Sequence, residues 1–141
     1  MNLLVDANVL LDVLQDRKPF VKDSSVIWKL CETGQAAGTV SALTFANLVY
    51  VMRKELDPGQ IEDVLRKLSM IFRFADFTAS DLSKAAALKL ENYEDAIQSV
   101  TAERVRADYI VTRNVRDFAR SRVPARTPAE IGEIFLLPFV L

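Results

Sequence analysis

Hydrophobic and polar residues follow two different periods along this chain, and the change from one period to the other separates predicted strands from predicted helices. Short apolar runs, typical of buried strands, occur at residues 2–6, 38–42, 71–77, 108–112 and 123–127. Between these runs, apolar residues recur every three or four positions, which predicts helices at residues 8–16, 21–33, 45–56, 60–70, 81–90, 91–106 and from residue 128 onward. Because strands alternate with helices, we expect an α/β fold with a parallel sheet covered by helices on both faces.

Several predicted helices have recognisable capping residues at their ends. Thr44 is the predicted N-cap of the middle helix, and the tripeptide DPG at 57–59 ends that helix. Thr78 or Ser80 is expected to cap a later helix. The tetrapeptide TPAE at 127–130 forms a predicted capping box, which opens the last helix.

Composition restricts the chemistry that the chain can carry out. We expect one domain spanning residues 1–141, and the 18 basic and 19 acidic residues give a net charge of −1, which neither favours nor opposes nucleic-acid binding. The single cysteine, Cys31, excludes an internal disulfide and is expected to be a small buried side chain. The absence of histidine excludes Ser-His-Asp triads and histidine-containing zinc sites. A hydrolase of this composition would therefore depend on carboxylates.

Neither end of the chain predicts an association with a membrane. The first apolar run is short and contains two aspartates, unlike a secretion signal. The apolar sequence IFLLPFVL at 134–141 is much shorter than the roughly 20 residues of a membrane span. We therefore expect a cytoplasmic protein with no membrane partner, in which this segment packs on the core or at a subunit interface.

Polar residues interrupt the apolar segment that follows the first predicted strand. Asp6 has apolar neighbours on both sides, where a carboxylate is costly to bury unless it is paired, hydrogen-bonded or bound to a metal. Asn8 lies two residues later, and capping of the next helix is its alternative role. Asp12 lies one helical turn after Asn8 and is either part of a site or an exposed helix residue. Asp6 is the strongest functional candidate of the three.

Two further segments add polar side chains to the predicted site. Asp95 lies at the start of a predicted helix, where its carboxylate either stabilises the helix N-terminus or points inward. Asn114 and Asp117 follow the fourth predicted strand and share one face of a short helical turn, with capping as the alternative. Because functional groups gather at the carboxyl ends of parallel strands, we expect these segments to meet Asp6. Oxygen ligands of this kind suit Mg²⁺ or Mn²⁺ and predict metal-assisted phosphodiester hydrolysis.

The order and spacing of these segments resemble a PIN domain, the nuclease fold of VapC-type toxins in bacterial toxin–antitoxin systems. The matching sequences are LVDANVLLD, SALTFANLVYVMRK, YEDAIQSVTAERVRADYIVTRNVRDF and TPAEIG. They span nearly the whole chain, and TRNVRDF is the most specific of them. The resemblance implies a three-layer α/β/α sandwich with a central, mainly parallel sheet. It also implies an endoribonuclease that uses Mg²⁺ or Mn²⁺.

The same resemblance implies roles for individual residues. The catalytic positions fall on Asp6, Asp95, Asn114 and Asp117. The three aspartates among them would hold the metal ion. The supporting positions fall on Asn8, Asn47 and Thr112. Many family members are inhibited by a small antitoxin that inserts a segment near the site, so we expect an RNA substrate, an antitoxin partner and a homodimer.

One position departs from the family pattern. Most active members carry a glutamate three residues after the threonine that opens the middle helix, whereas this chain has Asn47 there. Asparagine offers a carbonyl oxygen but no negative charge, so we expect weaker metal binding. Glu91 or Glu94 is a candidate to supply the missing charge. The alternative function is a PIN-like module that binds RNA or protein and has lost catalysis.

Arginines are concentrated near the predicted site. Residues 101–126 contain seven arginines and three acidic residues. Arginine can contact a phosphate through two hydrogen bonds, and Arg113 and Arg116 flank the site, so we expect both to bind RNA. For Arg104, Arg106 and Arg126, a solvated surface position is an equal alternative.

Overall fold

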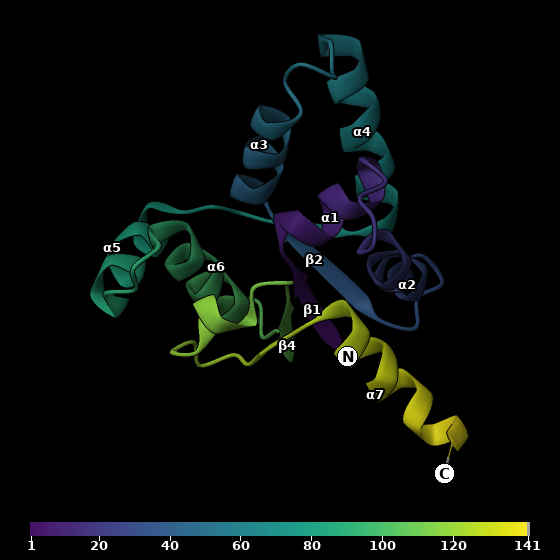
Figure 1. Cartoon of the computed structure of the whole chain (residues 1–141). Helices are drawn as coiled ribbons and strands as arrows, with labels where there is room; N and C mark the ends of the chain where they lie inside the picture. The colour runs from purple at the N-terminus through teal and green to yellow at the C-terminus, as the bar shows by residue number, and fades with distance from the viewer. Residues whose placement is uncertain (141) are drawn as a thin grey trace.

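A parallel sheet forms the centre of the molecule (Figure 1). The computed structural model describes the backbone of residues 1–140 and the side chains of residues 1–136. In this part of the chain five strands pair in the order β3-β2-β1-β4-β5, and every pairing is parallel. The strands are β1 (Asn2–Val5), β2 (Ala37–Ser41), β3 (Arg73–Ala75), β4 (Tyr109–Val111) and β5 (Ala125–Arg126).

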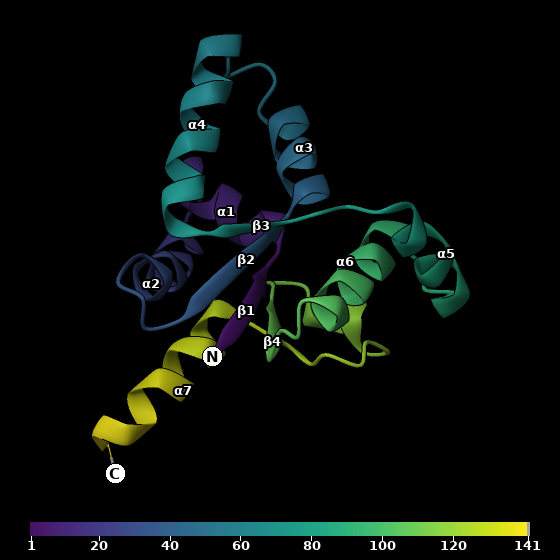
Figure 2. The ribbon, with the colours of Figure 1, turned by 180° about the vertical axis from the view of Figure 1, so that it is seen from behind.

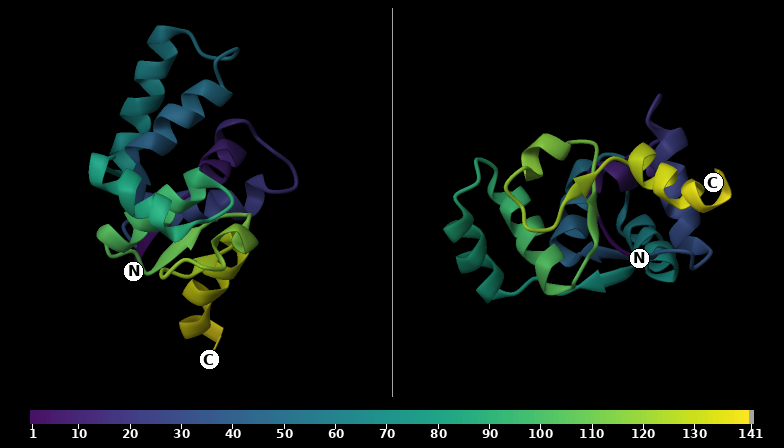
Figure 3. Two further views of the ribbon diagram at one scale, coloured as in Figure 1. Left: turned by 90° about the vertical axis from the view of Figure 1, so that its left-hand side faces the viewer. Right: turned by 90° about the horizontal axis from the view of Figure 1, so that it is seen from below.

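Helices connect these strands and cover both faces of the sheet (Figure 2). They are α1 (Ala7–Leu14), α2 (Val21–Glu32), α3 (Ala42–Val51), α4 (Pro58–Ile71), α5 (Ala79–Leu88), α6 (Tyr93–Arg104) and α7 (Pro128–Val140), with a 3-10 turn, η1 (Val115–Phe118). Two views at right angles to Figure 1 show the same arrangement of strands and helices from the side and from below (Figure 3). The predicted three-layer α/β/α architecture is confirmed.

Alternating residues of β1 supply the two apolar cores beside the sheet. Leu3 and Val5 point to one face, where they pack in a cluster with buried residues of α1, α2, α3, α4 and α7. Leu4, between them, points to the other face and packs with Ile110 and with Phe118 of η1. All three β1 side chains are fully buried. This alternation fixes the strand between two helical layers, because successive strand residues face opposite sides.

The register of β1 and β4 determines what lies at the carboxyl edge of the sheet. Val5 is paired with Val111, so the next residues of the two strands, Asp6 and Thr112, are neighbours although 106 positions separate them. The backbone N–H of Asp6 donates to the carbonyl of Val111 at 3.0 Å. The polar residues that follow the two strands therefore lie next to each other.

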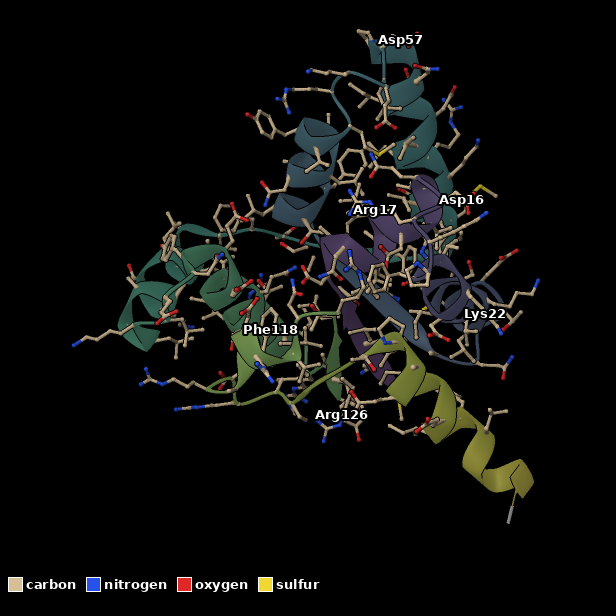
Figure 4. The ribbon with its side chains drawn as sticks, in the orientation of Figure 1. Asp16, Arg17, Lys22, Asp57, Phe118 and Arg126 are labelled. Atoms are coloured by element: carbon tan, nitrogen blue, oxygen red, sulfur yellow. The ribbon has the colours of Figure 1, made fainter. Side chains whose placement is uncertain are left out.

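The helices α3 and α4 extend away from the sheet as a pair joined by a short loop (Figure 1). Asp57 lies at the outer end of α4 (Figure 4), where its side chain accepts a hydrogen bond from the backbone of Gln60 at 2.8 Å. The Gln60 side chain accepts one from the backbone of Asp57 in return, which completes a capping box at the start of α4.

Other predicted caps are partly confirmed and partly wrong. Thr78 caps α5, and Thr127 exchanges hydrogen bonds with Glu130 at the start of α7, as predicted. The N-cap of α3, however, is Ser41 and not Thr44, because Ser41 ends β2 and its hydroxyl accepts from the backbone of Leu43. The helix therefore begins earlier than predicted.

The alternative role of Asn8 and one predicted strand end were wrong. Asn8 does not cap α1, because Asp6 occupies the cap position and accepts a hydrogen bond from the backbone of Ala7 at 2.8 Å. The strand predicted at 71–77 is limited to Arg73–Ala75, since α4 continues through Ile71.

Cys31 is a buried side chain, as predicted, and burial raises the pKa of its thiol to about 11. It lies against β2 at Gly38, where an added Cβ would be 2.6 Å from the Cys31 sulfur and 2.7 Å from the Phe72 ring. Only glycine therefore fits this strand position without displacing its neighbours.

The C-terminal apolar segment is described in part. Ile134 and Phe135 pack against the core that contains β1, in agreement with one of the two predicted roles, and Leu136 is exposed. The side chains of residues 137–141 lie outside the described residues. Within the described part, no helix is both long enough and apolar enough to span a bilayer.

Candidate active site

The Asp6 carboxylate lies at the centre of a hydrogen-bond network at the carboxyl edge of the sheet. One oxygen, Oδ1, accepts from the backbone of Ala7 at 2.8 Å and from Gln98 Nε2 at 3.2 Å. The other, Oδ2, accepts from the hydroxyl of Thr112 at 2.9 Å and from Asn8 Nδ2 at 3.4 Å. Four donors from three segments thus hold this carboxylate in one orientation.

Asn8 and Thr112 connect the segments that follow β1 and β4. The Asn8 amide donates to Thr112 Oγ1 at 3.2 Å and accepts from the backbone of Arg113 at 3.2 Å. Thr112 Oγ1 also accepts from the backbone of Asn114 at 3.0 Å. These contacts fix the loop that leads to Asn114 and Asp117 against the start of α1.

A cavity of about 160 Å³ lies between Asp6, α3 and α6. Asn47 of α3 lines it, together with Glu94, Asp95 and Gln98 of α6. Glu94, one of the two acids considered as a replacement charge, thus lines the same cavity as Asn47. The other, Glu91, lines a neighbouring cavity instead.

The neighbouring cavity, of about 510 Å³, lies between α6 and η1. Asp95 lines both cavities, whereas Asp117 and Arg116 line the second cavity but not the first. Asn114 lines a third and more open hollow beside it, again with Arg116 and Asp117. Asp95 therefore lies between the cavity that Asp6 lines and the cavity that Asp117 lines.

Several carboxylates act on the ionisation of Asp95. Burial, followed by the charges of Asp6, Asp117 and Glu94, raises the pKa of Asp95 from 3.8 to about 6. The local structure of α6 contributes to its position, because the Asn92 side chain caps the helix by accepting from the backbone of Asp95 at 3.2 Å. The sheet edge thus concentrates negative charge around one half-buried carboxyl group.

Comparison with known proteins agrees with this arrangement. The family model described as "PIN domain" matches residues 2–116. The chain belongs to the PIN domain family. No curated protein sequence matches it significantly.

Solved structures share the fold of this PIN domain at low sequence identity. A toxin–antitoxin complex from Klebsiella pneumoniae is 24% identical with a TM-score of 0.67, over 89% of this chain and 96% of that chain. VapBC2 from Rickettsia felis, bound to a DNA fragment from its promoter, is 17% identical with a TM-score of 0.67, over 90% and 98% of the two chains. VapC20 from Mycobacterium tuberculosis, described as a sarcin-ricin loop cleaving toxin, is 11% identical with a TM-score of 0.61, over 77% and 86%.

The acids of this PIN domain do not form a metal site by themselves. Among the described residues, no three His, Cys, Asp or Glu side chains are close enough together to hold an ion. An oxygen of a different kind is present, however, because Gln98 Oε1 is buried and has no hydrogen-bond partner within the described structure. A cation at this edge would therefore use amide oxygens as well as carboxylates, and a buried, unpaired acceptor fits that requirement.

Gln98 belongs to the hydrogen-bond network of Asp6 but was not predicted from the sequence. It is 7% exposed, and its amide donates to Asp6 and also to Thr44 Oγ1, the latter at 2.8 Å. The signal in the sequence was its spacing, since Gln98 lies three residues after Asp95 and shares that face of α6. A glutamine among buried residues on a helix face needs polar partners within the fold, and that requirement was the only indication in the sequence.

Asp12 lies outside the two cavities that Asp95 lines, and it is not an exposed helix residue. Its side chain is fully buried, pairs with Arg113 Nε at 3.0 Å and accepts from the Ser24 hydroxyl at 2.8 Å. The Arg113 guanidinium packs 4.0 Å above the Phe20 ring. Arg113 therefore connects the loop after β4 to α1 and α2, while Arg116 is exposed.

Two of the more distant arginines have contacts of their own. Arg104 pairs with the buried carboxylate of Asp81 at 3.0 Å. The guanidinium of Arg126 lies 5.4 Å from the ring of Tyr109 and donates to a backbone carbonyl. These contacts give both residues structural partners, although Arg104 is also exposed to solvent. Arg106 is exposed.

Proposed function

We propose that this PIN domain is a metal-dependent endoribonuclease and the toxin of a toxin–antitoxin pair in the cytoplasm. The observation that carries the proposal is that Asp95 lines one cavity with Asp6 and a neighbouring cavity with Asp117, although the three aspartates belong to separate segments. Carboxylates concentrated in this way favour a bound divalent cation. The similarity to VapC20, described as a sarcin-ricin loop cleaving toxin, supports the choice of substrate.

The residues of the site divide the work of hydrolysis in this proposal. Asp6, Asp95 and Asp117, together with amide oxygens of the site, would hold Mg²⁺ or Mn²⁺, because the three carboxylates do not form a metal site by themselves. When bound, the ion would supply an activated water and stabilise the leaving oxygen. Asn114 completes the catalytic set on the same loop as Asp117. The donors on Asp6, including Asn8 and Thr112, keep its carboxylate oriented toward the site.

RNA would approach across the open cavity that Arg116 lines. An exposed arginine there can contact a phosphate through two hydrogen bonds. Arg113 was expected to act in the same way, but its guanidinium already faces Asp12 and Phe20. We therefore assign the larger share of RNA binding to Arg116. Arg113 follows β4 on the same segment and would contribute less.

A PIN module without catalysis is the second candidate, and two features of the site favour it. Asn47 provides no negative charge at its cavity. The four donors on Asp6 also satisfy the carboxylate without any metal. Such a module would bind RNA or protein without cutting.

Cleavage of a mixed RNA pool distinguishes the two candidates. The purified protein is incubated with Mn²⁺ or with EDTA, beside Asp6→Asn and the exposed control Asp23→Asn. We expect metal-dependent cleavage by the wild type and the control and none by Asp6→Asn. Absence of cleavage by folded wild-type protein, with activity gained in Asn47→Glu, would favour the module without catalysis.

An antitoxin partner and a homodimer are also part of the proposal. The similar structures from Klebsiella pneumoniae and Rickettsia felis are described as a toxin–antitoxin complex and as VapBC2. Co-expression with the product of an adjacent short reading frame, followed by light scattering of the purified sample, measures both associations. A monomer that retains no small partner would contradict this part.

A further inference from the structure

Within the described structure, the nitrogen of the Gln98 side-chain amide has hydrogen-bond partners, whereas the oxygen has none. The nitrogen donates to Asp6 Oδ1 at 3.2 Å and to Thr44 Oγ1 at 2.8 Å. The oxygen is buried without a hydrogen-bond partner among the described residues. The side chain as a whole is 7% exposed and lines the cavity that Asp6 and Asn47 also line. A buried acceptor without a donor is unfavourable, so this arrangement requires an explanation.

Rotation of the amide by half a turn exchanges its oxygen and nitrogen without changing its shape. The oxygen would then accept from the Thr44 hydroxyl, which can donate as well as accept. The nitrogen would take the buried position in which the oxygen has no partner now, so one end of the amide is unpaired in either orientation. The rotated oxygen would also lie beside Asp6 Oδ1, at about the separation that the nitrogen has now. Two oxygens this close repel each other unless a cation lies between them.

A divalent cation changes which orientation of the amide is preferred. Adjacent oxygen ligands of an octahedral Mg²⁺ ion, each about 2.1 Å from the metal, are about 3 Å apart. The Gln98 amide is already near this separation from Asp6 Oδ1. The rotated amide would therefore place a neutral oxygen ligand next to the carboxylate.

We propose that Gln98 is a cation-dependent ligand of this site. Without a cation it donates to Asp6, and with Mg²⁺ or Mn²⁺ it presents Oε1 to the ion beside that carboxylate. Gln98 thereby supplies an oxygen in the cavity where Asn47 lacks the charge of a carboxylate. The inference rests on the proposed function, because it requires a cation to bind at Asp6.

A fixed hydrogen bond is the opposite explanation, and it predicts the opposite effect on metal binding. If Gln98 only holds Asp6, its amide competes with the cation for Oδ1. Removal of the amide would then strengthen metal binding. If Gln98 is a ligand, removal of the amide weakens metal binding.

Binding of Mn²⁺ to the full chain, measured by titration calorimetry in the absence of RNA, decides between the two. We expect Gln98→Leu, which has a similar size but no amide, to weaken Mn²⁺ binding about tenfold or more. We expect Asp6→Asn to weaken it further, and the exposed control Gln60→Leu to leave it unchanged. Equal or tighter binding by Gln98→Leu would overturn the inference on Gln98 alone. A wild type that binds no Mn²⁺ would overturn the proposed function as well.

A second measurement needs no substitution in the protein under test. Mg²⁺ is titrated into ¹³C-labelled wild-type protein, and the side-chain carbonyl resonances of glutamine and aspartate are followed. Gln98→Glu identifies the Gln98 resonance. We expect the Gln98 carbonyl to shift together with the Asp6 carboxyl carbon, while Gln60 does not move. A shift at Asp6 with none at Gln98 would show that Gln98 is not a ligand.

Discussion

Replacement of Asp95 by asparagine is expected to make the protein more stable at neutral pH, although it removes a predicted catalytic residue. Burial and the charges of Asp6, Asp117 and Glu94 raise the pKa of Asp95 to about 6. The ionised carboxylate is therefore less favourable in the folded protein than in the unfolded chain. Asparagine keeps the size of the side chain and removes its charge, so the unfavourable interaction disappears.

The size of this effect follows from the pKa. A rise from 3.8 to about 6 corresponds to about 3 kcal/mol before the screening of charge by water is considered. Asp95 is only half buried, so about half of this energy remains. Asparagine also loses the attraction of a carboxylate to the N-terminus of α6, which is about 0.5 kcal/mol. The net gain is about 1 kcal/mol at pH 8, or about 3 °C in Tm.

The gain depends on pH because Asp95 titrates in the folded state. The folded pKa lies above the unfolded value, so the folded protein binds the proton more tightly. Its contribution to stability is present at low pH and is lost as the pH rises through about 6. At pH 5 most folded molecules carry the proton already, and the advantage of Asp95→Asn shrinks to a few tenths of a kcal/mol.

Thermal unfolding in EDTA at pH 5 and pH 8 tests the reasoning. Asp23→Asn is the matched control, because Asp23 is also the third residue of its helix, α2, and is exposed. We expect the control to lose a little stability equally at both pH values. An Asp95→Asn variant that is no more stable than the wild type at pH 8, or equally stabilised at both pH values, would refute the electrostatic account.

Two further predictions concern the neighbouring arginines and the packing of β2. Arg113→Ala is expected to lower the free energy of unfolding by about 3 kcal/mol, because it leaves Asp12 buried without its ion pair. Urea titration measures both variants, and Arg116→Ala should leave the free energy of unfolding unchanged. Arg116→Ala should instead weaken RNA binding and reduce the slope of log K against log salt concentration by about one. Gly38→Ala should lower the urea midpoint by an amount equivalent to about 1–3 kcal/mol through overpacking against Cys31. The control Gly132→Ala should not, because an added Cβ there comes no closer than 3.7 Å to its neighbours.

Local sequence was sufficient to predict the architecture and the position of Asp6. The apolar residues on both sides of Asp6 predicted that it ends a buried strand, and parallel strands place such ends at one edge. The capping box from Thr127 to Glu130 was likewise predictable, because both partners lie within one helical turn. Patterns of this kind depend on neighbours in the chain, so the sequence contains the information.

Thr44 shows where local reasoning failed. A threonine before an apolar helix resembles an N-cap, but the end of β2 places Ser41 in that role. Thr44 instead lies inside α3, buried, with Gln98 donating to its hydroxyl. The strand that precedes the helix decided which hydroxyl caps it.

The sequence by itself determined the order of strands and helices, though not all of their ends, and that polar residues follow β1 and β4. Only the tertiary structure decided which partner each polar group has. Asp12 was open to two interpretations because its partner Arg113 is 101 residues away, and Gln98 was overlooked because Asp6 is 92 residues away. Hydrogen bonds and ion pairs of buried side chains are fixed by packing between elements. Their partners therefore become known only when the sheet brings those elements together.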